Sequence, residues 1–162
     1  MNQSALYANT AINSWKISVT RLNQLFDACS DEDLQKEVAP GKNRIFYLLG
    51  HMAAVHDRMF PLLGLGPRLH DELDADFVTN PDRYGADRIQ ASALRKAYAT
   101  INDALTRAIE ALPAEDWLKR HEAISDEDFA REPLRNRLSV LLSRTAHVQF
   151  HAGQIRLAVK PR

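Results

Sequence analysis

Apolar residues recur in alternating steps of three and four along four stretches of the chain. The first stretch has them at Ala5, Ala8, Ile12, Trp15, Val19, Leu22, Phe26 and Cys29. The same spacing returns between Ile45 and Met59, between Leu94 and Leu112, and between Leu134 and Val159. Because side chains three and four residues apart share one face of an α-helix, each stretch predicts a long amphipathic helix. Four such helices favour a four-helix bundle.

Residues that cap or break helices separate these stretches. Ser30 is followed by three acidic residues and predicts the start of a short helix, which Ala39-Pro40-Gly41 should stop. Asn43 is then expected to cap the second long helix, and Pro61 to kink or end it.

Two of the connections are long. The first, Gly64 to Ala86, contains three glycines and the turn signal Asn80-Pro81, so we expect a loop with a turn or two of helix within HDELDADF. The second follows Pro113 and contains SDEDF, which we interpret as another capping sequence before a last helix that begins near Pro133. Long connections after the second and third helices permit crossovers, which leaves the order of the helices open.

The composition agrees with an all-α fold in a single domain, residues 1–162. Ala and Leu together number 42, whereas Val and Ile number 15, which favours helix over strand. The only cysteine, Cys29, cannot form an intrachain disulfide, and the first residues lack the features of a signal peptide, so we expect a cytoplasmic protein. The 21 basic and 21 acidic residues cancel, and the run from Ile45 to His56 is too short for a bilayer. These features predict neither a nucleic-acid partner nor a membrane span.

Three of the six histidines form a candidate metal site. His147 and His151 are four residues apart and share one face of the last helix. His51 stands in the same angular relation to the apolar stripe of the second long helix, while His56 points about 140° away. Spacing alone fits ordinary histidines at the edge of a core equally well. If the three converge, they match the His₃ arrangement of catalytic zinc sites, and nickel or iron are alternatives.

The last helix offers basic groups but no carboxylate. No Asp or Glu occurs after Pro133, and Val148 stands where a zincin helix carries its general base, so we do not expect a protease of that type. Arg144 lies one turn before His147 and is a candidate contact for an anionic substrate group. Gln154, one turn after His151, could hold a ligand imidazole by a hydrogen bond, or could equally be a solvated surface residue. Gly153 predicts the close approach of another helix or chain.

Three segments carry a resemblance to the DinB-like family. They are NRIFYLLGHMAAVHDRM at 43–59, PLLGLGPRL at 61–69 and RNRLSVLLSRTAHVQFHAGQI at 135–155, with the ending HxxxHxGQI the most specific. The resemblance covers nearly the whole chain. It implies a four-helix bundle with a variant up-and-down topology, commonly a homodimer, and one divalent metal ion held by one histidine of the second helix and two of the last. These roles fall on His51, His147 and His151.

The resemblance leaves two function classes open. Some members of the family are transferases or isomerases that depend on a low-molecular-weight thiol, which would make this chain a metal-dependent enzyme acting on a small electrophile. Others have no known activity, so a non-catalytic or stress-related binding module is the alternative. No individual catalytic residue is assigned from the sequence.

Overall fold

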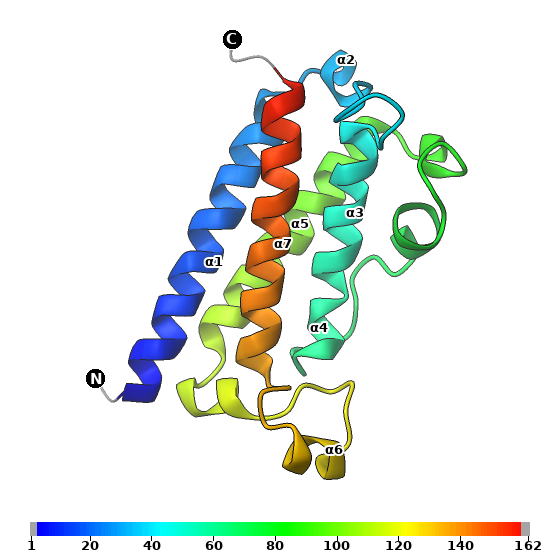
Figure 1. Cartoon of the computed structure of the whole chain (residues 1–162). Coiled ribbons are helices and arrows are strands. Elements are labelled where there is room, and N and C mark those ends of the chain that lie inside the picture. The colour runs from blue at the N-terminus through cyan, green and yellow to red at the C-terminus, as the bar shows by residue number, and fades with distance from the viewer. Residues whose placement is uncertain (1–2, 160–162) are drawn as a thin grey trace.

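The computed structural model describes residues 3–159, and within that range every regular element is helical (Figure 1). The α-helices are α1 (Gln3–Ala28), α2 (Asp31–Leu34), α3 (Ile45–Asp57), α4 (Met59–Leu62), α5 (Ala91–Ala111), α6 (Asp126–Arg131) and α7 (Arg137–Ala158). The shorter turns are π-helical at Ala75–Thr79 and 3₁₀-helical at Ala86–Arg88 and Ala114–Leu118. The all-α prediction is confirmed.

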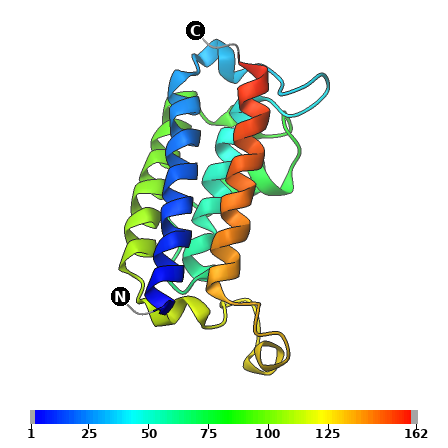
Figure 2. The same cartoon turned by 60° about the vertical axis from the view of Figure 1, so that its left-hand side comes forward.

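The four predicted long helices are α1, α3, α5 and α7, and they pack side by side (Figures 1 and 2). The helices α1 and α7 run in one direction and α3 and α5 in the other, because the segment after α4 carries the chain back along α3 before α5 begins (Figure 1). Trp15, Ile101 and Leu141 are completely buried in one shared core, as their stripes predicted.

Two predicted helix starts are wrong. Asn43 does not cap α3: the cap residue is Arg44, whose backbone N–H donates to Asp82, while the Ile45 N–H donates to the Lys36 carbonyl. The last helix begins at Arg137 and not near Pro133, because the Asn136 side chain accepts from the Ser139 N–H and caps it there.

Leu134, which we placed on the buried stripe of the last helix, is 79% exposed for the same reason. Ser30 and Ser125 do cap α2 and α6 as predicted, each accepting from a backbone N–H three residues on. Pro61 lies inside the single turn of α4, and of the HDELDADF segment only the end is part of the π-helical turn.

No helix in the described range 3–159 is long and apolar enough to cross a membrane. Gly153 is exposed, and a Cβ built there would meet nothing within 4 Å. The close approach predicted at this glycine is therefore not made by another helix of the described chain.

Candidate metal centre

The structure brings His51 of α3 together with His147 and His151 of α7. The His147 Nε2 atom lies 2.9 Å from Nε2 of His151 and 3.4 Å from Nε2 of His51. One ligand atom from each ring falls within 4.8 Å of the other two. A tetrahedral ion with nitrogen ligands at about 2.0–2.1 Å separates those nitrogens by roughly 3.3 Å, so the three rings fit one metal ion.

Hydrogen bonds behind two of the rings leave their Nε2 lone pairs directed at Nε2 of His147. The His51 Nδ1–H donates to the Phe77 carbonyl at 2.8 Å, and the His151 Nδ1–H donates to Oε1 of Gln154 at 2.8 Å. A neutral imidazole that donates through Nδ1 keeps an unprotonated Nε2. Both lone pairs face Nε2 of His147, and when Nδ1 of His147 carries that ring's proton, the three Nε2 atoms together form the donor set of a His₃ metal site.

Burial keeps all three imidazoles in the form that binds metal. Desolvation lowers the pKa of each ring, and it lowers that of His147 to about 4, with the neighbouring His151 and His51 as further causes. The charge of Arg144 also lowers the pKa of His51 and of His147. Near neutral pH the cluster is therefore uncharged and ready to coordinate.

Aromatic side chains flank the cluster. The Tyr47 ring stacks on His51 with a centroid distance of 6.2 Å, and the Phe150 ring meets the edge of His151 at 5.1 Å. Phe150 is largely exposed, whereas His151 is only 8% exposed. The cluster thus has an apolar border on its solvent side.

The sequence analysis did not identify Phe77. Its carbonyl reaches His51 because the residue before His51 in α3 is a glycine, Gly50. A Cβ at Gly50 would lie 2.2–2.5 Å from three atoms of the Phe77 ring, well inside any real contact. Only glycine allows the π-helical turn to pack this closely on α3. The absence of a side chain at position 50 therefore places the carbonyl that holds His51.

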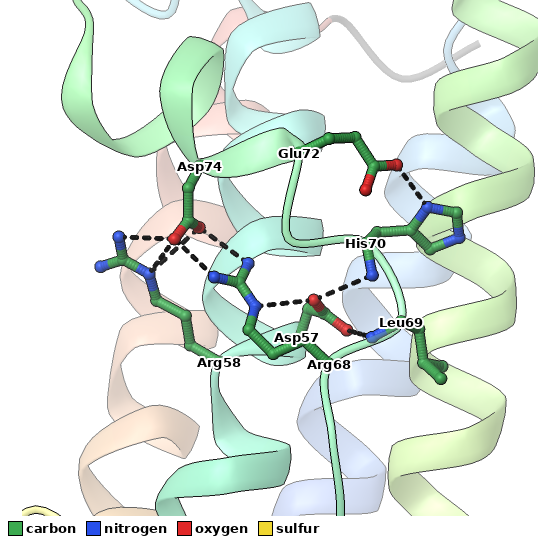
Figure 3. Close-up of polar contacts among 7 residues, drawn as sticks. All are labelled: Asp57, Arg58, Arg68, Leu69, His70, Glu72 and Asp74. Atoms are coloured by element: carbon green, nitrogen blue, oxygen red, sulfur yellow. Dashed lines mark hydrogen bonds and ion pairs between the residues drawn. The ribbon is translucent and has the colours of Figure 1, made fainter.

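A charged network fastens the same loop to the end of α3 (Figure 3). The Asp57 carboxylate is fully buried and accepts from Arg68 Nε at 2.9 Å and from the Leu69 and His70 N–H groups at 2.8 and 3.1 Å. Arg68 also pairs with Asp74, to which Arg58 is bound as well. Asp57 directly follows HMAAVH, but no periodicity in the sequence marked it as the anchor of this loop.

Of the other residues predicted from the sequence, Gln154 accepts the hydrogen bond from His151. Arg144 is half-buried on α7, and within residues 3–159 it has no ion-pair partner; burial and the charge of Arg58 lower its pKa. His56 is fully buried away from the cluster, where its Nδ1–H donates to Asn102 at 2.6 Å.

The fold and the three converging histidines are those of an all-α protein that is compatible with metal binding. The family model of the DinB superfamily matches residues 15–155, so the chain belongs to the DinB superfamily. A comparison with curated proteins found no match.

Proposed function

We propose that the protein is a metal-dependent enzyme of the DinB-like type that holds one divalent ion per chain at His51, His147 and His151. The observation that supports this proposal is the convergence of three neutral imidazoles, two of them half-buried and that of His151 buried, at 2.9 and 3.4 Å. Zinc is the first candidate, and nickel or iron would suit the same nitrogens. We further propose that the four long helices form the variant up-and-down bundle of this family.

We infer that the reaction is a thiol-dependent transfer or isomerisation on a small electrophile. A divalent ion held by three neutral ligands keeps its full charge and lowers the pKa of a thiol in its open position. The chain itself contributes no carboxylate from α7 to accept that proton. Its residues keep the ligand rings neutral, orient them through Phe77 and Gln154, and offer Arg144 to an anionic group.

We also propose that the protein is a cytoplasmic homodimer. Leu142, Phe150 and Leu157 lie along the outer face of α7 and are 50%, 62% and 89% exposed, and Gly153 opens on the same line. An apolar stripe of this kind is typical of an interface. Light scattering should return the mass of a dimer for the parent, and the mass of a monomer for Leu142→Glu.

Metal analysis tests the central proposal. Protein purified without a histidine tag should contain about one divalent ion per chain, and His51→Ala, His147→Ala and His151→Ala should each lose it. His70→Ala is the matched control, because His70 lies outside the cluster and its Nδ1 bonds to Glu72. A variant of His56 that loses metal as completely as the three, or a cluster variant that keeps it, contradicts the proposed site.

Activity is tested with the same proteins. The metal-loaded parent is assayed with several small thiols and a model electrophile beside His151→Ala. We expect turnover by the parent alone. Equal rates for the two proteins would favour the non-catalytic binding module.

A further inference from the structure

A second feature of α7 is a surface pocket beside its first two turns. The pocket has a volume of about 230 Å³ and is lined by residues of these turns and by Leu62 at the end of α4. The start of α7 and the end of α4 both lie toward the bottom of Figure 1. The polar lining of the pocket is His121, Arg135, Asn136, Ser139, Ser143 and Arg144. No Asp or Glu is among the described residues that line it.

The two charged groups that line this pocket are both cationic and poorly neutralised. Arg144 has no ion-pair partner within the described chain, and it is repelled by the nearby Arg58. Arg135 reaches only the exposed Glu132, at 3.7 Å. Two arginines without a firm carboxylate partner favour an anion, because a guanidinium donates several parallel hydrogen bonds to a carboxylate or a phosphate.

The uncharged groups of the pocket add donors of the same kind. His121 accepts from the Ala123 N–H through Nδ1, so the proton of its neutral ring is on Nε2 and can be donated. Ser139 and Ser143 carry hydroxyl groups one turn apart on α7. The pocket also lies at the positive end of a 22-residue helix.

Arg144 connects this pocket with the metal centre. It lines the pocket, and its charge acts on His51 and His147. At 1.5 Å of rise per residue, Ser143 and Ser139 lie roughly 6 and 12 Å below His147 along the helix axis. This axial separation matches the length of one small molecule.

We propose that this pocket binds the anionic end of the thiol co-substrate, a carboxylate or phosphate group held roughly 6–12 Å from the sulfur that approaches the three histidines. The inference rests on the proposed function and specifies the substrate class of the same site. Arg144 and Arg135 pair with the anion, and the serine hydroxyls and His121 complete its hydrogen bonds. A neutral thiol of equal length lacks these contacts.

A series of thiols of increasing length tests the proposal. Protein loaded with cobalt(II) is titrated with ω-mercaptoalkanoic acids, with the corresponding mercaptoalkyl phosphates, and with neutral mercaptoalcohols of matched length, and the thiolate-to-cobalt absorption band is followed. We expect the anionic thiols to bind about tenfold more tightly than the alcohols at an intermediate length, since one pair of charge-assisted bonds contributes about 1.4 kcal/mol. The acids and the phosphates together identify which anion the pocket prefers.

Two arginine variants distinguish binding in the pocket from a general effect of the protein's positive charges on anionic thiols. Arg144→Gln should abolish the preference for the anionic thiols while the alcohols still produce the absorption band. Arg156→Gln removes the same charge from an exposed position near the other end of α7, and we expect it to leave the preference intact. Equal losses in the two variants would overturn the proposal.

Inorganic phosphate supplies a readout that needs no metal. Calorimetry on the metal-free protein should detect phosphate binding in the parent and in Arg156→Gln, and a loss in Arg144→Gln. If the acids and the alcohols bind equally well to the parent, the pocket does not bind the anionic end of the thiol, whereas the proposal that a thiol binds the metal is unaffected. If no thiol produces the band but phosphate binds as described, the thiol part of the proposed function fails and the anion pocket stands. Absence of phosphate binding in the parent counts against the pocket directly.

Discussion

Gly50→Ala should destabilise the protein, although the substitution improves the helix propensity of α3. The new Cβ would lie 2.2–2.5 Å from the Phe77 ring, whereas ordinary contacts begin near 3.4 Å, so the ring must retreat by more than 1 Å. Phe77 is 1% exposed and packs against Phe46 and Tyr47. The retreat therefore requires overpacking or a loss of burial, which costs about 1–3 kcal/mol.

Replacing a helical glycine by alanine contributes roughly 0.5–1 kcal/mol in the opposite direction. The midpoints of the two ranges leave a net loss of about 1 kcal/mol, which for a chain of this length lowers Tm by roughly 2–4 °C. Because Phe77 carries the carbonyl that holds His51, the affinity for metal should also fall, by about tenfold. Thermal denaturation and a metal titration against a competing chelator measure the two effects.

A double-mutant cycle with Phe77→Ala isolates the cause. Once the ring is removed, the Cβ at position 50 has room, and Gly50→Ala should be neutral or stabilising in that background. Additive effects of the two substitutions, or a Gly50→Ala protein as stable as the parent with unchanged metal affinity, would refute the proposed contact as the reason for the glycine.

Three further predictions concern single residues. Burial lowers the pKa of His56 to about 3, and an unfolded histidine titrates near 6.5, so only the unfolded chain takes up this proton between those pH values. Stability should therefore fall by about 1 kcal/mol per pH unit from this group as the pH decreases below about 6.5, and urea titrations of His56→Gln should show a shallower decline. Asp57→Ala removes a fully buried carboxylate from Arg68 and two backbone N–H groups, and should cost about 2–4 kcal/mol and expose the 64–86 loop to proteolysis in a limited digest. Gln154→Ala should weaken metal binding by about tenfold with little change in Tm, since the residue acts on His151 alone; a large loss of stability would contradict that role.

The features that repeat along the helices could be predicted from the sequence. The stripe through Trp15 located a long helix, and the angular position of His51 relative to its stripe matched that of His151, which made the cluster possible. The same reasoning directed His56 away from the cluster. These predictions hold because helical geometry converts sequence spacing directly into spatial direction.

Contacts made by irregular backbone could not be predicted in this way. The periodicity of Leu134 continued the last stripe, but a side-chain cap at Asn136 determined where α7 begins. Two of the partners of Asp57 are N–H groups 12 and 13 residues further along, and they depend on the path of a loop that has no repeat. The Phe77 carbonyl that accepts from His51 could not be predicted either, because every residue has a carbonyl and nothing in the sequence distinguishes that of Phe77.

The group that orients His51 belongs to the main chain, so no side-chain substitution at position 77 deletes it. An alanine scan of the 64–86 loop would record Phe77 as a packing residue and would overlook its hydrogen bond to the ligand. An ester in place of the amide that follows Phe77 would weaken the carbonyl as an acceptor while leaving the side chain intact. For the same reason the exposed side chains of this loop can be exchanged wherever its route over α3 is preserved, and a shortened or rerouted loop would disturb the metal centre without altering any of its three ligands.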